Sequence, residues 1–211
     1  MSDIIIELPD SVKSFFVPTA SFFPPLPTAP APHRRYNLAM PMTPFFQRFP
    51  ERGARETRSL TVTGSNDLPD GDYGFIELYC NEPHCDCRRV MVVVLRPDTG
   101  WKQFWATINY GWESREFYRQ WAGAPHGDRG PWQGPFLDPL AAQTPYAPVL
   151  LELFKSLLQS PDYVQRLKSH YQLFRAAVEK DPPGSDGHPQ PPGVTKHPHR
   201  RHRKRSPKGR K

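Results

Sequence analysis

The hydrophobic pattern between residues 59 and 110 is typical of short strands separated by turns. Residues 74–80 alternate between two faces, residues 90–95 form a continuous β-branched and apolar run, and residues 101–110 are rich in aromatic side chains. A continuous run of this kind suits a strand that is covered on both sides. Because the intervening turns are short, we predict an antiparallel meander, with a weaker strand at 59–63.

After the predicted strands, apolar residues recur at the spacing of amphipathic helices. Ser114 is the expected N-cap of a short helix that ends at Trp121, and a second helix is predicted at 147–159. The third, at 160–180, begins with an N-cap serine, a proline and an acid. His170 stands in the middle of its apolar stripe and is predicted to face the sheet. The stripe consists of Tyr163, Val164, Leu167, Tyr171, Phe174 and Val178.

The two ends of the chain are rich in proline and poor in regular patterns. Ten of the 27 prolines lie in residues 1–50 and seven in 181–211. We therefore expect one domain at 56–180, between a Pro/Phe-rich extended arm at 1–55 and a disordered basic tail at 181–211. Prolines disfavour a helix in the arm, whereas its seven phenylalanines predict that parts of it lie on the domain. The expected fold class is α+β: an antiparallel sheet of three or four strands packed against two or three helices.

The net charge of +7 comes from the tail. Residues 196–211 hold nine of the 28 Lys and Arg residues and no acid, which leaves 19 bases against 21 acids in the rest of the chain. Such a polycation could bind nucleic acid or another polyanion through phosphates without reading sequence, and a solubility tail is the alternative. The residues proposed for this contact are Arg200, Arg201, Arg203, Lys204 and Arg205.

The sequence predicts no membrane span, because no stretch reaches the roughly 18 apolar residues that crossing a bilayer requires. The first residues lack the basic and apolar regions of a secretory signal. An odd number of cysteines in one cluster is typical of metal binding in a reducing compartment. We therefore expect a cytoplasmic protein.

The three cysteines of the chain, Cys80, Cys85 and Cys87, lie within eight residues of one another. A tight turn between two strands would direct their thiols to one point. Structural zinc is normally held by four thiolate or imidazole ligands in a tetrahedron. The spacing therefore predicts a Zn²⁺ site, for which we expect His170 to provide the fourth ligand.

Several alternatives to this site remain open. His84 or His126 could replace His170, and the thiols could be an inert reduced cluster. Cys85 and Cys87 could form a disulfide in a thiol redox protein, because the two arginines that follow favour thiolate. Three cysteines and a water on the metal would instead suit a metal-dependent hydrolase. No catalytic motif is recognisable, so no catalytic residue is assigned and we expect a non-enzymatic protein.

Three segments of the chain carry a resemblance to a known group. Residues 75–89 with their C-x4-C-x-C pattern, residues 108–121 (INYGWESREFYRQW) and residues 163–171 resemble uncharacterised bacterial proteins, over about residues 70–178. The resemblance implies a cytoplasmic protein with a cysteine-rich metal site and no assigned reaction. The chain lacks the cysteine spacing of the small zinc motif of the SEC-C type. Together these observations predict a structural-zinc binding or adaptor module that its tail could tether to a polyanion or that could bind a protein partner.

Overall fold

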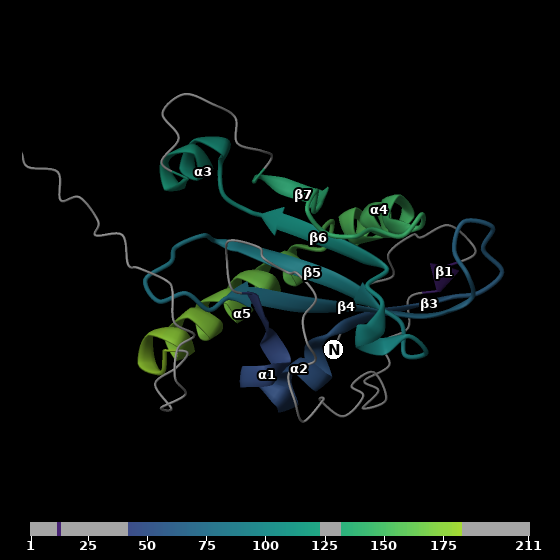
Figure 1. The fold of residues 1–211 in the computed structure, drawn as a ribbon, viewed down its shortest axis with the longest axis horizontal. Helices are drawn as coiled ribbons and strands as arrows, with labels where there is room; N and C mark the ends of the chain where they lie inside the picture. The colour runs from purple at the N-terminus through teal and green to yellow at the C-terminus, as the bar shows by residue number, and fades with distance from the viewer. Residues whose placement is uncertain (1–11, 14–41, 123–131, 183–211) are drawn as a thin grey trace, which may run out of the picture.

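The computed structural model describes residues 12–13, 42–122 and 132–182, which form one antiparallel sheet with helices packed on it (Figure 1). The strand order is β1-β3-β4-β5-β6-β7, and β2 also pairs with β4. The predicted α+β architecture is confirmed, although the sheet has more strands than the three or four expected. The strands are β1 (Val12–Lys13), β2 (Met42–Pro44), β3 (Arg58–Val62), β4 (Gly71–Cys80), β5 (Arg89–Leu95), β6 (Ala106–Gly111) and β7 (Gly134–Leu137). The helices are α1 (Phe45–Arg48), α2 (Pro50–Glu56), α3 (Arg115–Trp121), α4 (Ala147–Leu157) and α5 (Pro161–Lys180), with a 3₁₀ turn at Gly100–Lys102.

The centre of the sheet is the predicted meander of β4, β5 and β6. Glu77 pairs with Val92, and Val92 pairs in turn with Ile108. Every residue of β5 is buried, as expected for a β-branched run that is covered on both faces. The third strand begins at Ala106 and not at Trp101, because Trp101 lies in the 3₁₀ turn.

Two apolar clusters lie on opposite faces of the sheet. The larger contains Phe75 and Ile108 of the sheet together with Phe154 of α4 and Phe174 of α5. Figure 1 shows α5 running across the face formed by β4 and β5. The smaller cluster, on the other face, consists of Phe46, Ile76, Leu78, Met91, Val93 and Leu95. Both faces of the central strands are therefore covered by apolar contacts.

The starts of α3 and α5 follow the predicted capping. The Ser114 hydroxyl accepts a hydrogen bond from the Phe117 amide at 3.1 Å, and the Ser160 hydroxyl accepts one from the Tyr163 amide at 3.4 Å. Each hydroxyl satisfies an amide that has no partner within its helix. Pro161 occupies the first turn of α5, where its missing N–H removes no hydrogen bond.

The expectation that prolines exclude helices near the N-terminus is wrong for residues 45–56. Pro50 stands at the first position of α2, where a proline is tolerated. Phe45 joins the larger apolar cluster and Phe46 joins the smaller one. This short helical segment is therefore fixed by burial of two adjacent aromatic rings on opposite sides of the sheet.

β7 lies between α3 and α4, in a part of the chain for which the sequence pattern predicts no strand. It extends the sheet by pairing with β6, with Gly134 opposite Gly111. A Cβ at Gly111 would come within 2.0 Å of the Trp132 carbonyl oxygen and 2.5 Å of the Tyr118 hydroxyl, so this close approach requires glycine.

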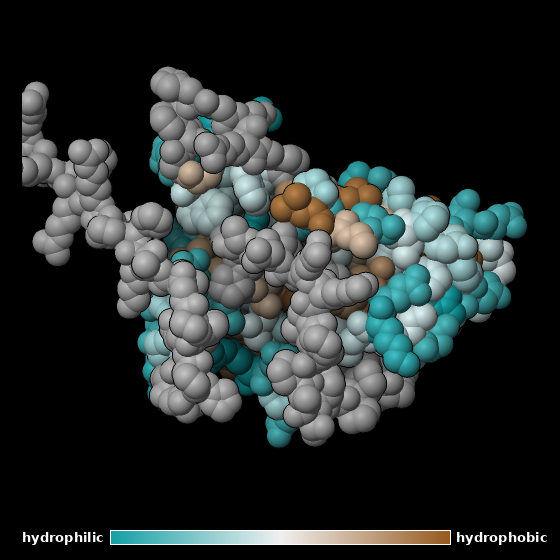
Figure 2. Space-filling view, in the orientation of Figure 1, coloured by the Kyte–Doolittle hydropathy of each residue, from teal (hydrophilic) through white to brown (hydrophobic). Residues whose placement is uncertain are grey.

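The described surface is mainly polar, and in Figure 2 the apolar residues on this side gather in small patches between polar ones. Leu140 is the sole large apolar side chain that is exposed among the described residues. Within the same ranges, none of the helices combines the length and the apolar character that crossing a membrane requires.

Candidate metal centre

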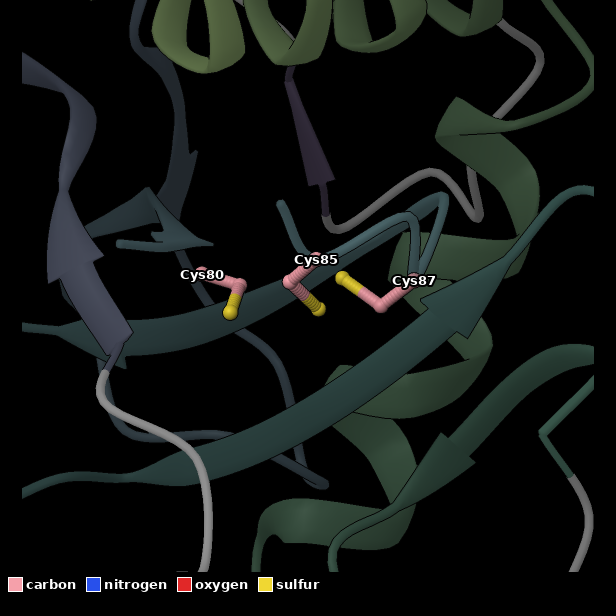
Figure 3. Close-up of side chains that lie close together, drawn as sticks. All are labelled: Cys80, Cys85 and Cys87. Atoms are coloured by element: carbon pink, nitrogen blue, oxygen red, sulfur yellow. The ribbon is translucent and has the colours of Figure 1, made fainter. Parts of the chain in front are cut away.

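The three cysteines meet where β4 turns into β5. Cys80 is the last residue of β4, and Cys85 and Cys87 lie in the connecting loop at 81–88. Their sulfur atoms all lie within 4.8 Å of one another (Figure 3). Tetrahedral zinc with bonds of about 2.3 Å separates its sulfur ligands by roughly 3.8 Å, so a contraction of about 1 Å would suffice to bind an ion. The prediction that this loop gathers the three thiols is confirmed.

The backbone on either side of Cys85 and Cys87 is held in an unusual conformation. His84 and Arg88 have φ angles of 61° and 42°, in the left-handed region that residues with a Cβ rarely adopt. The His84 amide donates to Glu179 at 2.8 Å, and the Arg88 amide donates to the Tyr171 hydroxyl at 3.3 Å. Both acceptors belong to α5, so this helix fixes the two strained positions of the loop.

A third residue of α5, Arg175, lies between these two acceptors on the same face. Its guanidinium donates to the carbonyl of Glu82 at 2.8 Å and to that of Cys80 at 3.3 Å, and it also pairs with Glu179. Residues four apart on a helix face the same way, so Tyr171, Arg175 and Glu179 form one row along α5. Sequence reasoning missed this row, although its spacing of four was a usable signal.

Hydrogen bonding within the cluster separates the acidities of the thiols. Contacts with Cys85 and Cys87 lower the pKa of Cys80 to about 3. The same contact with Cys80 raises the pKa of Cys85 to about 11, and contacts with Cys80 and Cys85 raise the pKa of Cys87 well above its usual range. A metal ion that binds all three sulfurs must therefore displace protons from the cluster, so metal affinity should depend on pH.

Arg89 is a buried cation beside the cluster. It is only 6% exposed, and its guanidinium carbon lies 4.6 Å from the ring centroid of Trp132 and 5.7 Å from that of Trp121. Its Nε has no hydrogen-bond partner, and no described carboxylate forms an ion pair with it. Burial lowers the pKa of Arg89, whereas the neighbouring sulfurs of Cys87, Cys80 and Cys85 raise it.

His170 is buried in the middle of α5 and faces β4, as predicted, but its partners are carboxylates. Its Nδ1 lies 2.7 Å from Glu77 and its Nε2 lies 2.7 Å from Glu56, while the ring of Phe45 stacks on it at 4.0 Å. Burial alone would lower the pKa of His170, but the two acids outweigh this effect and raise it. Carboxylates thus engage both nitrogens of the imidazole, and His170 does not belong to the group of ligand atoms that the three cysteines form. We therefore do not retain His170 as the fourth zinc ligand. The neighbouring residue, Tyr171, is the one that reaches the cysteine loop.

The remaining predicted site residues lie elsewhere. The side chain of His84 is 89% exposed and pairs with Glu179 at 3.0 Å. Within the described ranges, no fourth Cys, His, Asp or Glu joins the three cysteines at ligating distance. His126 lies outside the described residues, as do the basic residues of the tail: Arg200, Arg201, Arg203, Lys204 and Arg205.

Comparisons with protein-family models, with curated proteins and with solved structures find no match to this chain. The geometry of the cysteine cluster is therefore the main guide to function.

Proposed function

We propose that Cys80, Cys85 and Cys87 bind a zinc ion and that the protein is a non-enzymatic binding module whose fold this ion stabilises. The observation that carries the proposal is the convergence of three sulfur atoms within 4.8 Å. Thiolate donors in a tetrahedral arrangement suit zinc, whereas carboxylate and carbonyl oxygens would suit magnesium or calcium.

A structural role for the ion follows from the loop that carries the ligands. The loop holds two left-handed residues, His84 and Arg88, which are costly in the absence of compensating contacts. An ion bound to Cys80 of β4 and to Cys87 before β5 would join the two ends of this loop. Metal binding energy would then contribute directly to folding stability.

The fourth ligand is proposed to come from outside the described residues, and His126 is the candidate that the sequence supplies. A water molecule in this position would leave the open coordination that catalytic zinc requires. Replacement of His126 by alanine distinguishes the two cases. It should weaken zinc binding if the imidazole is a ligand and leave the affinity unchanged if water completes the tetrahedron.

The test is the metal content of the purified full-length chain after dialysis. We expect about one zinc per chain, and loss of that zinc in Cys87→Ser. Asp86→Asn is the matched control, because Asp86 lies between two of the ligands but has a side chain that is 57% exposed. Co²⁺ substitution should give the sulfur-to-metal charge-transfer band of a thiolate site in the wild type and in the control.

Absence of bound metal in the wild type, or full zinc content in Cys87→Ser, would contradict the proposal. Reversible formation of a disulfide between Cys85 and Cys87 in a metal-free chain would instead support the redox alternative.

The proposal extends to the tail as a polyanion contact and to a reducing, cytoplasmic location that would keep the thiols free. If Arg200, Arg201, Arg203, Lys204 and Arg205 each neutralise one phosphate, the logarithm of the affinity for duplex DNA should fall with the logarithm of salt concentration with a slope of about −4.5. Truncation after Lys180 should abolish this salt-sensitive binding. Unchanged binding by the truncated chain would remove the polyanion role and leave a solubility tail.

A further inference from the structure

We propose that Arg89 is a positioning residue for the metal centre: a buried cation whose charge neutralises the excess negative charge of a divalent ion held by three thiolates. This inference rests on the proposed metal binding and adds the feature of the fold that makes the site selective for a divalent ion.

Arg89 carries a charge that is buried without an ion pair to any described carboxylate. Arg89 begins β5, two residues after Cys87, and is 6% exposed. Arginine is almost never buried to this extent without an anionic partner. None of the carboxylates in the described ranges pairs with it, and its Nε is buried without a hydrogen-bond partner. Burial lowers the pKa of this guanidinium, and the three cysteines, of which Cys87 lies two residues away in the sequence, raise it.

Arg96 lies in similar aromatic surroundings but has an acidic partner. It follows β5, and its guanidinium carbon lies 5.2 Å from the ring centroid of Tyr73 and 4.9 Å from that of Trp105. Its Nε donates to Asp98 at 3.1 Å. Both arginines thus lie on a pair of aromatic rings. Arg96 has an acid partner, whereas none of the acids among the described residues pairs with Arg89, which lies beside the cysteine cluster. Aromatic faces hold a guanidinium in place without cancelling its charge.

The site would keep a negative charge when a divalent ion is bound to the three cysteines. Three thiolates and one divalent ion carry a net charge of about −1, and a neutral fourth ligand does not change it. Arg89 brings the buried assembly to neutrality. A monovalent ion such as Cu⁺ on the same thiolates would leave one negative charge uncompensated. The arrangement therefore favours divalent ions over monovalent ones.

The experiment measures zinc affinity by competition with a chromophoric chelator at fixed pH. It compares the wild-type chain with Arg89→Met, Arg89→Lys and the matched control Arg96→Met. Removal of an outer contact of a metal site typically costs 10- to 100-fold in affinity, which is the loss expected for Arg89→Met. Arg89→Lys keeps the charge and should stay within about threefold of the wild type, as should Arg96→Met. The charge-transfer band of the Co²⁺ form should shift in Arg89→Met and not in Arg96→Met.

Each outcome decides a different point. A wild-type chain that binds no zinc removes the proposed function itself. A wild type that binds zinc, with Arg89→Met binding equally well or Arg96→Met weakened as much, overturns the role of Arg89 alone. If Arg89→Met does not fold, Arg89→Lys decides the matter: a tenfold weaker affinity shows that the shape of the guanidinium matters and not its charge, and this overturns the inference.

Discussion

The buried pairing of His170 with two acids gives the sharpest prediction for stability. In the change His170→Gln the imidazole is lost, while the carboxylate of Glu77 remains 5% exposed on β4. The hydroxyl of Tyr79 still donates a hydrogen bond to this carboxylate at 2.8 Å, but it brings no positive charge. We expect a large loss of stability, because a buried charge keeps its desolvation cost after its counter-ion is removed.

The magnitude follows from the burial of each pair. Breaking a buried ion pair by removing one partner costs about 3–5 kcal/mol. The pair with Glu56 has one partner that is 32% exposed, so we assign it about 0.5 kcal/mol, as for a surface pair. His170→Gln should therefore lower the free energy of unfolding by about 4 kcal/mol, and Glu56→Gln by about 0.5 kcal/mol.

The effect should depend on pH with a definite sign. The pKa of His170 is raised in the folded state, because the attraction of Glu77 and Glu56 exceeds the opposing effect of burial. The stability contributed by the protonated imidazole is thus fully present below the unfolded pKa of about 6.5. It is lost as the pH rises through the raised folded pKa. The difference between wild type and His170→Gln should accordingly shrink towards alkaline pH.

Urea unfolding at several pH values measures these differences, and the zinc content of each variant is determined in parallel. A loss below about 1 kcal/mol for His170→Gln, or an equal loss for Glu56→Gln, would show that the buried pair with Glu77 stabilises the fold no more than a surface pair does. Loss of zinc from a folded His170→Gln chain would show that the imidazole is a ligand after all.

Four further substitutions are checked by the same urea titration. Ser160→Ala removes the N-cap of α5 and should cost about 1 kcal/mol, and no loss would mean that the cap hydrogen bond is replaced by solvent. Gly111→Ala should cost about 3 kcal/mol, because the added Cβ would collide with Trp132. The control Gly64→Ala places its Cβ in open space at φ +66° and should cost about 1 kcal/mol. Equal losses in the two variants would contradict the close approach at Gly111. Tyr118→Phe leaves a loop carbonyl without its donor at 2.7 Å and should cost about 1–2 kcal/mol, and a neutral result would mean that the carbonyl finds water.

The parts of the fold that sequence predicts well are those with a strong local signal. The Ser160 cap, the proline after it and the apolar stripe placed α5 correctly, and alternation placed β4. Residues 45–56 gave no such signal, because helices of four and seven residues depend on tertiary contacts and not on their own propensity. The burial of Phe45 and Phe46 provides those contacts, and it is visible only once the sheet is known.

The candidate site shows the same division between local and distant information. The spacing of the cysteines predicts their convergence, because the loop that joins them is short. The inward position of His170 was also predictable, but its partner was not. A second signal was present in Glu77, an acid between Phe75 and Tyr79 on the face that α5 covers. Two buried polar residues on facing elements are expected to pair, and this argument favours Glu77 over the thiols as the partner of the imidazole.

α5 contacts both the core and the cysteine loop through adjacent rows of side chains. The stability of the loop can therefore differ from that of the core. His170 is buried on α5, as are Leu167 and Phe174 of the core, whereas Arg175 and Glu179 hold the cysteine loop at the surface. Removal of zinc by a chelator should therefore increase hydrogen exchange in residues 81–88 and leave residues 163–174 protected, because the core contacts of the helix do not involve the ion. Hydrogen-exchange mass spectrometry resolves these segments. Equal deprotection of both would show instead that the ion supports the whole domain, as in small zinc modules that unfold without their metal.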